Sequence, residues 1–252
     1  MASHGGILGL VLFTWFYAKA KKVSWTGLGD GLCVAATLGL FFGRMANFIN
    51  GELYGRVAQG VSWAMKFPLA LSDPKAPESS HFFDAAEAAV RKAPELQQPY
   101  DQMISAWDLY EKLGTPDSQM QLADARTRFF DAMLHANRTV EGMPETLGNY
   151  LLPRHPSQLY EGALEGLLLF SILFFVRVRF PRMPHGIVTG LFFILYAIFR
   201  ICAEQFREPD AALILNGLLT KGQFYSVFMI AAGAAFLIHG WKKGSPPLNP
   251  EE

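Results

Sequence analysis

The sequence predicts an all-α protein, a polytopic membrane helix bundle with about five transmembrane helices and a small helical insertion. Of the 252 residues, 51% are hydrophobic and only 17% are charged, which is low for a soluble domain of this size. The apolar residues form separate runs flanked by basic residues, whereas many acidic residues gather in one polar stretch. This distribution separates the predicted membrane helices from the predicted insertion.

Five apolar runs are the candidates for membrane helices. A spanning helix needs roughly 20 residues, and several of the runs reach that length only when their polar ends are counted. Short apolar runs are also typical of core helices in soluble proteins. Five such runs, bounded by Lys/Arg clusters or aromatic residues, favour a membrane protein. The runs cover residues 5–18, 28–42, 163–176, 186–201 and 224–241.

Three basic clusters give the predicted bundle an orientation. Helices that alternate in direction place all three clusters on one side of the membrane, and the positive-inside rule makes that side cytoplasmic. The opposite helix ends then face outward, which in a bacterium is the periplasmic side. The clusters are Lys19, Lys21 and Lys22 after the first run, Arg177, Arg179 and Arg182 between the third and fourth, and Lys242 and Lys243 after the fifth.

The polar stretch predicts a small helical periplasmic domain or lid. Between positions 56 and 154 the chain has 13 of its 22 acidic residues and 8 basic ones. Apolar residues recur at helical spacing in 84–92, 101–113 and 118–137. A variable surface loop without chemistry is the alternative interpretation. The predicted organisation is two membrane helices in 1–56, the insertion in 57–153, three membrane helices in 154–243 and a cytoplasmic tail in 244–252.

Polar residues gather in four segments at the outward ends of the predicted helices. Charged groups at membrane depth are costly unless they are used, so their convergence on one face predicts a functional site. The segments are SHGG at 3–6, GRMANFINGELYGR at 43–56, RHPSQLYE at 154–161 and YAIFRICAEQFREPD at 196–210.

Arginines in these segments suggest an anionic ligand, and the phosphates of membrane lipids are the obvious candidates. Tyr196, Arg200, Glu204 and Arg207 step by four, four and three residues, which predicts one helical face where Glu204 orients Arg200. An ordinary ion pair and snorkelling arginines are the alternatives, but snorkelling does not explain the adjacent asparagines and glutamates. The predicted binding residues are Asn47, Asn50, Glu52, Gly55, Tyr196, Glu204 and Arg207, beside the principal arginines Arg44 and Arg200.

His4 is one of few groups here able to act as a base near neutral pH, although a lone histidine at a helix end is often structural. His155, Tyr160 and Glu161 are interpreted as structural or positioning groups. The sequence has no metal-binding motif, no glycine-rich nucleotide loop and no nucleophile–base pair. We therefore expect neither a metal nor a cofactor, and no covalent enzyme intermediate.

The four segments, in this order, closely resemble the motifs of the phosphatidylglycerol–prolipoprotein diacylglyceryl transferases. The resemblance implies transfer of a diacylglyceryl group from phosphatidylglycerol to the lipobox cysteine thiol of a prolipoprotein, with release of glycerol phosphate. It implies that Arg44 and Arg200 bind the phosphoglycerol group, that Asn47 and Glu52 order it, and that His4 is the base. The implied partners are phosphatidylglycerol, the prolipoprotein signal peptide and the inner membrane. No nucleic acid is implied, and the expected state is a monomer.

Two departures from that family bear on the expected activity. Its members have more membrane helices than the five predicted here, and the additional helices are expected before His4. The insertion is also longer than is usual. The alternative is therefore a truncated, non-catalytic membrane protein that binds anionic lipid or a lipoprotein signal peptide. A lipid or anion transporter would instead show internal repeats and polar groups near the bilayer midplane, and neither is visible.

Overall fold

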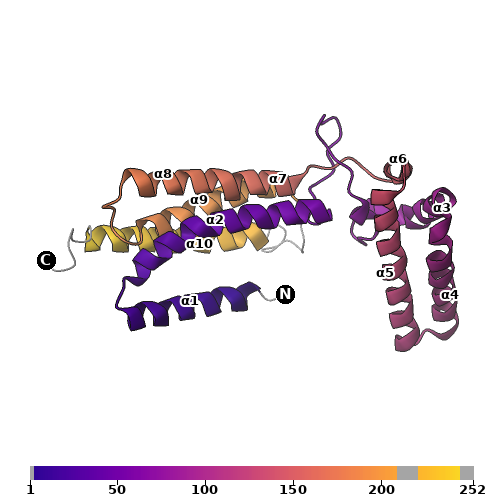
Figure 1. The fold of residues 1–252 in the computed structure, drawn as a ribbon, viewed down its shortest axis with the longest axis horizontal. Helices are drawn as coiled ribbons and strands as arrows, with labels where there is room; N and C mark the ends of the chain where they lie inside the picture. The colour runs from indigo at the N-terminus through magenta and orange to yellow at the C-terminus, as the bar shows by residue number, and fades with distance from the viewer. Residues whose placement is uncertain (1–2, 209–220, 245–252) are drawn as a thin grey trace. The chain divides into compact units, whose positions relative to one another are not determined.

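The computed structural model describes residues 3–208 and 221–244, without the side chains of Ser3, His4, Ile7 and Lys221. Most of the predicted cytoplasmic tail therefore lies outside the described residues. The regular elements within the described ranges are all helices (Figure 1). The chain divides into two units, Met1–Arg56 with Pro156–Glu252 and Val57–His155. We call them the membrane unit and the insertion unit.

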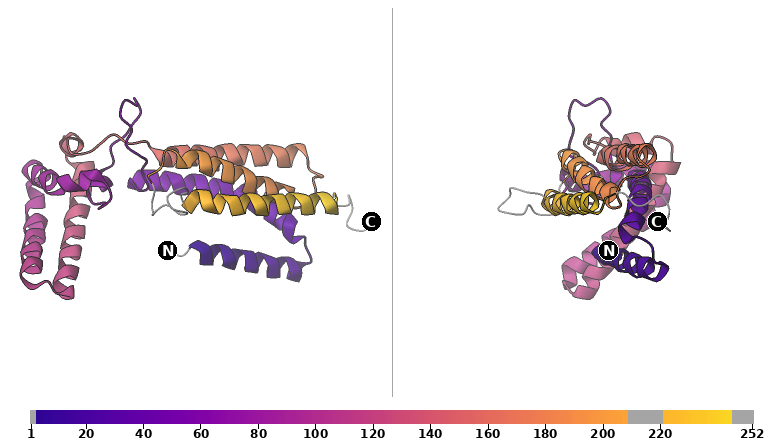
Figure 2. Two further views of the ribbon diagram at one scale, coloured as in Figure 1. Left: turned by 180° about the vertical axis from the view of Figure 1, so that it is seen from behind. Right: turned by 90° about the vertical axis from the view of Figure 1, so that its left-hand side faces the viewer.

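The membrane unit is a bundle of long helices that lie side by side (Figures 1 and 2). Four of its helices, among the described residues, are long and apolar enough to cross a membrane, which confirms the polytopic helical class. These spans are α2 (Trp25–Asn50), the helix Ser157–Arg179, α9 (Ile187–Glu204) and the part Gly222–Lys243 of α10 (Lys221–Lys243). The first predicted run forms α1 (Ser3–Lys21), which is helical but is not among these four.

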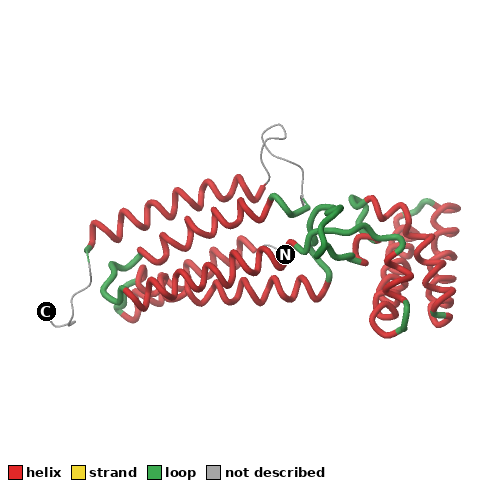
Figure 3. Tube along the Cα trace, turned by 90° about the horizontal axis from the view of Figure 1, so that it is seen from above, coloured by secondary structure: helices red, strands yellow, loops and turns green. Residues whose placement is uncertain are grey.

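The helix Ser157–Arg179 changes its winding along its length. It begins as α7 (Ser157–Glu161), continues as the π-helical turn η4 (Gly162–Leu168) and ends as α8 (Leu169–Arg179). The three basic clusters lie at the same end of the membrane unit, at the left in Figure 1. The ends of α2 and α9 that contain the predicted site lie at the opposite end (Figure 1). The tube in Figure 3 shows the long helices of the membrane unit from above.

A buried aspartate anchors α9 at the basic end of the bundle. Asp30, on α2, accepts hydrogen bonds from the backbone N–H groups of Gly186 and Thr189, both at 2.8 Å, and from the Thr189 hydroxyl at 2.7 Å. The first N–H groups of a helix have no partner within the helix, and a carboxylate both satisfies them and complements the helix dipole. Asp30 therefore ties the start of α9 to the flank of α2.

The insertion unit is helical, as the amphipathic spacing predicted. The three predicted helices are confirmed as α3 (Phe82–Lys92), α4 (Gln97–Leu113) and α5 (Pro116–Thr139), and each begins two to four residues earlier than the apolar pattern indicated. In α5 the earlier start has a local cause, because Thr115 and Ser118 form a capping box with Pro116 at the first helical position. A short helix, α6 (Met143–Gly148), follows, and the 3-10 turns are η1 (Pro68–Leu71), η2 (Pro77–His81) and η3 (Pro94–Leu96).

The insertion unit contains a buried ion pair between η2 and the end of its chain segment. Arg154 donates from Nε to Glu78 Oε1 at 2.8 Å and from Nη2 to Glu78 Oε2 at 2.7 Å, and both side chains are 1% exposed. The backbone of Arg154 also exchanges two 2.9 Å hydrogen bonds with Met65. Burial alone would raise the pKa of Glu78, but the hydrogen bonds and charge of Arg154 outweigh it and lower that pKa.

We predict that Arg154→Met destabilises the insertion unit by about 3 to 5 kcal/mol near neutral pH, because it leaves a buried, ionised Glu78 without its positively charged partner. Pairing lowers the pKa of Glu78, so the ion pair contributes its full stabilisation at pH values above the ordinary pKa of 4.5. This stabilisation is lost as the pH falls through the folded-state pKa of Glu78. The difference in unfolding free energy between the wild type and Arg154→Met should therefore become smaller in acid. Hydrogen exchange of the Met65 amide in the full chain measures it.

Arg128→Met is the matched control, because Arg128 pairs with Asp124 on the exposed surface of α5. We expect this variant to change the exchange of the Met65 amide very little. Equal effects of the two substitutions would contradict a structural role for the buried pair.

Candidate active site

The last two turns of α2 carry the signature segment to the end of the bundle opposite the basic clusters. Arg44 and Asn47 are helical, and α2 ends at Asn50 because Gly51 adopts a left-handed conformation with φ 74°. The N–H of Glu52 then bonds to the Asn47 carbonyl at 2.9 Å, and that of Gly51 bonds to the Phe48 carbonyl at 3.0 Å. This is a Schellman end, which satisfies the final carbonyls of the helix and turns the chain sharply.

Two glycines let the π-helical turn η4 approach α2 closely. A Cβ atom on Gly166 would lie 2.6 Å from Phe41 Cβ and 2.9 Å from Phe41 Cα, so only glycine fits there. A Cβ on Gly162 would lie 3.0 Å from Met45 Cε and 3.4 Å from Arg44 Cβ. Small residues four apart are a common way for membrane helices to pack. The close packing places Glu161 and Glu165 beside Arg44.

Glu161 is the centre of the charged cluster. Its Oε2 atom lies 2.6 Å from Arg44 Nη2, 2.8 Å from Arg200 Nη1 and 3.1 Å from Arg207 Nη1. Its side chain is completely buried, while those of Arg44 and Arg200 are 15% and 16% exposed. One carboxylate thus joins three arginines, which come from α2, from α9 and from the chain just after α9.

Glu165 and Glu204 complete the cluster. Glu165 Oε2 lies 3.3 Å from Arg44 Nη2, and Glu165 Oε1 lies 3.6 Å from Arg200 Nη1. Glu204 Oε2 lies 3.1 Å from Arg200 Nη2, the contact that the predicted orientation of Arg200 by Glu204 requires. The α10 helix adds a close contact, because a Cβ on Gly222 would lie 2.8 Å from Glu204 Oε2.

The arginines keep donors for a ligand. Among the described residues, Arg44 makes its polar contacts through Nη2 alone, and Arg200 makes its contacts through Nη1 and Nη2. The Nε and Nη1 groups of Arg44 and the Nε group of Arg200 therefore remain for an acceptor. Guanidinium groups held in a fixed pose by buried carboxylates can bind a phosphate with little reorganisation.

The turn after α2 is held from the start of α7. Ser157 Oγ donates to the Leu53 carbonyl at 3.0 Å, and Gln158 Nε2 donates to the Glu52 carbonyl at 2.6 Å. Both side chains are completely buried, and Leu53 has a positive φ of 56°, which is unusual for leucine. Ser157 and Gln158 therefore hold a strained turn in place.

One prediction about this region is wrong. Arg207 does not continue the helical face of Tyr196, Arg200 and Glu204, because α9 ends at Glu204 and a turn at residues 205 and 206 precedes Arg207. The backbone of Arg207 forms an antiparallel bridge with Gly55, and its carbonyl accepts from Arg56 Nε at 2.9 Å. The Arg207 side chain nevertheless reaches Glu161 and joins the cluster from outside the helix.

The other predicted site residues lie in different surroundings. Asn50 and Glu52 have exposed side chains at the end of α2, and the half-buried ring of Tyr196 stacks on Phe192. The Tyr160 ring packs edge-on against Phe206 at 5.4 Å between centroids. His155 belongs to the insertion unit, and the side chain of His4 is outside the described part of the structure, although its backbone lies in α1.

Sequence reasoning assigned no role to four residues at this cluster, although Glu165 was noted beside the third polar segment. Glu165 follows Glu161 by one turn, and that spacing was the available signal for its role. Gly162 and Gly166 share the same spacing, but their importance depends on the approach of α2. No signal in the sequence connects Gly222 with Glu204.

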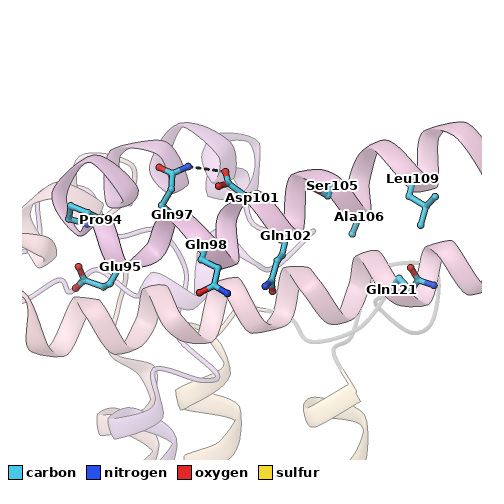
Figure 4. Close-up of a pocket in the computed structure, with 10 residues that line it drawn as sticks. All are labelled: Pro94, Glu95, Gln97, Gln98, Asp101, Gln102, Ser105, Ala106, Leu109 and Gln121. Carbon is cyan, nitrogen blue, oxygen red and sulfur yellow. Dashed lines mark hydrogen bonds between the residues drawn. The ribbon is translucent and has the colours of Figure 1, made fainter.

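A cavity of about 910 Å³ lies in the insertion unit and includes none of the cluster residues. It is an open groove between α4 and α5 (Figure 4), in which Gln97 Nε2 donates to Asp101 Oδ1 at 2.8 Å. Among the described residues, no group of three or more His, Cys, Asp or Glu side chains could hold a metal ion. The lining residues are Pro94, Glu95, Gln97, Gln98, Asp101, Gln102, Ser105, Ala106, Leu109 and Gln121.

The fold and the cluster define a class of protein. The chain is a multi-pass membrane protein with a buried arginine–glutamate cluster at one end of its helices, suited to an anionic ligand. It belongs to the prolipoprotein diacylglyceryl transferase family, whose family model matches residues 1–239.

Curated relatives support this membership. The chain is 35% identical over 270 residues to a phosphatidylglycerol–prolipoprotein diacylglyceryl transferase of Bdellovibrio bacteriovorus, covering 97% of this chain and 70% of that protein. It is 37% identical over 245 residues to a relative of the same name from Burkholderia multivorans (96% and 64%). It is 35% identical over 242 residues to one from Photorhabdus laumondii (96% and 62%). The chain thus spans between 62% and 70% of the length of these relatives.

We predict that Gly166→Ala disrupts the site from a distance. The new methyl group would lie 2.6 Å from Phe41 Cβ and within 2.9 Å of the α2 backbone, so α2 and the charges on it must shift. Overpacking of this kind costs about 1 to 3 kcal/mol. Thermal unfolding of the full chain in detergent measures the loss.

Gly39→Ala is the matched control, because a Cβ on this α2 glycine would meet nothing within 4 Å. We expect this control to be as stable as the wild type or slightly more stable. Equal stabilities of the two variants would contradict the close packing of α2 against η4.

Proposed function

We propose that the protein transfers the diacylglyceryl group of phosphatidylglycerol to the lipobox cysteine thiol of a prolipoprotein. A thioether forms, and glycerol phosphate is released. The observation that carries this proposal is the position of Arg44 and Arg200, which Glu161 holds while some N–H groups of each guanidinium make no contact with a described residue. The family to which the chain belongs supports the same reaction.

In this proposal the two arginines bind the phosphate of the lipid and stabilise its departure. The thiolate sulfur attacks the glycerol carbon that bears the phosphate ester oxygen, a carbon–sulfur bond forms, and the carbon–oxygen bond breaks. The electron pair of that bond moves to the phosphate, which leaves as a phosphate monoester with additional negative charge. Fixed donors aimed at developing charge are a large source of catalysis because they need not reorganise during the reaction.

The remaining roles are assigned within the same proposal. His4 takes the thiol proton. The start of α1, which contains His4, lies toward the same end of the membrane unit as the charged cluster, and this supports the assignment. Asn47 and Glu52 order the headgroup, and Tyr196 lines the lipid site. Glu204 and Arg207 keep the cluster in place through Arg200 and Glu161.

The proposed setting is the inner membrane of a bacterium, with the site toward the periplasm. The common position of the three basic clusters at one end of the helices supports this orientation by the positive-inside rule. The lipid enters from the bilayer, the signal peptide approaches from outside, and the protein acts as a monomer.

A transfer assay tests the proposal directly. The purified full chain is given phosphatidylglycerol and a lipobox peptide, and the release of glycerol phosphate is followed. We expect release that requires the peptide cysteine and that Arg44→Ala abolishes. Binding of the lipid without any release would instead support the non-catalytic alternative.

We further predict that Arg200→Lys lowers kcat/KM by about 100-fold, because lysine keeps the charge but lacks the planar set of donors that holds Glu161, Glu204 and a phosphate together. The measurement is the same transfer assay at varied lipid concentration. Arg177→Lys at the basic end of the bundle is the control, and we expect it to leave kcat/KM unchanged. Near-wild-type turnover of Arg200→Lys would argue against geometric recognition of the phosphate.

A further inference from the structure

The charges of the cluster balance before any ligand arrives. Among the ion pairs of the described residues, three arginines, Arg44, Arg200 and Arg207, face three glutamates, Glu161, Glu165 and Glu204. A phosphodiester brings one further negative charge into a largely buried site. Uncompensated charge is expensive in such surroundings, so the site must gain a positive charge or lose a negative one when the lipid binds.

Glu165 is the carboxylate held least tightly. Its contacts with arginine nitrogens measure 3.3 and 3.6 Å, against 2.6, 2.8 and 3.1 Å for Glu161. Glu165 Oε1 is buried and has no hydrogen-bond partner among the described residues. Glu204 Oε2 is also buried and forms no hydrogen bond with a described residue. It lies 3.1 Å from Arg200 Nη2, however, which is closer than either contact of Glu165 with an arginine.

The groups around Glu165 make it the natural place for a proton. Arg44 faces it from α2, Arg200 faces it from α9, and Tyr196 on α9 lies within electrostatic reach. Glu161 lies one turn away on the same helix, and both carboxylates contact the same nitrogen of Arg44. A phosphate that binds the two arginines therefore competes directly with Glu165 for their charge. Like charges that share one site favour protonation of the more weakly held group.

We propose that binding of an anionic phospholipid to this cluster is coupled to protonation of Glu165. The carboxylate of Glu165 takes one proton from water, and its contacts with Arg44 and Arg200 weaken. The lipid phosphate then forms ion pairs with these two arginines. The cluster is then neutral both with and without the lipid. This inference rests on the proposed binding of phosphatidylglycerol, and it makes Glu165 a residue that sets lipid affinity.

The test is the pH dependence of phosphatidylglycerol binding to the full chain in detergent micelles, with phosphatidylcholine as the zwitterionic control lipid. If one proton enters with the lipid, the Kd of the wild type rises by up to about tenfold for each pH unit. In Glu165→Gln the amide is neutral at every pH, so binding should be tighter than wild type at high pH and nearly independent of pH.

Glu204→Asp is the matched control, because it alters another carboxylate of the same cluster, conserves the net charge of the cluster and leaves Glu165 in place. We expect this variant to keep the pH dependence of the wild type, whatever its affinity. The same slope in wild type and Glu165→Gln would overturn the inference while leaving phosphatidylglycerol binding intact. Failure of the wild type to prefer phosphatidylglycerol at any pH would overturn the proposed function as well.

A second measurement needs no variant to fold. Titration of the wild type with phosphatidylglycerol in weakly buffered solution should take up about one proton for each lipid bound, and an indicator dye reports that uptake. Infrared difference spectra should show the carbonyl band of a newly protonated carboxylic acid. Lipid binding without proton uptake would contradict the inference.

Discussion

The buried carboxylate of Glu161 is the interaction on which the site depends. It contacts three arginines at 2.6, 2.8 and 3.1 Å, and these arginines come from α2, from α9 and from the chain after α9. Removing one member of a buried ion-pair network leaves the others desolvated without compensation, which costs far more than the pair itself contributes. The three segments are therefore constrained together, and none can move independently of the others.

That constraint acts at one end of helices that are fixed at the other end too. Asp30 holds the first N–H groups of α9 against α2 with three hydrogen bonds of 2.7 to 2.8 Å. A helix tied at both ends has a set length and rotation, so Arg200 at the far end of α9 is positioned partly by a residue 170 positions earlier in the chain. Gly162 and Gly166 supply the third constraint, because they set how closely α2 approaches Glu161. The site thus depends on helix packing over the whole span.

Much of this arrangement could be predicted from local patterns. Apolar runs indicated the helices, and the four-residue step from Arg200 to Glu204 indicated their ion pair. The central role of Glu161 could not be predicted in the same way, because it requires two helices and a loop to converge, and no local spacing encodes that. Arg207 illustrates the limit. Its membership of the cluster was anticipated from helical periodicity, yet α9 ends before it and a bridge to Gly55 positions it instead. Gly222 gave no signal, since its close contact with Glu204 exists only in the packed bundle.

A neutral cluster explains how so many charges can lie at membrane depth. Three unpaired arginines there would be costly and would bind any available anion, whereas three matched glutamates lower the cost and keep the guanidinium groups aligned. The equal numbers of arginines and glutamates also constrain the ligand, because an anion can bind the arginines only by displacing a carboxylate from them. Glu161 has the shorter contacts and holds the arginines together, while Glu165 has the longer ones and is the group that can release them. Structural stability and ligand response are therefore assigned to two carboxylates four residues apart on one helix.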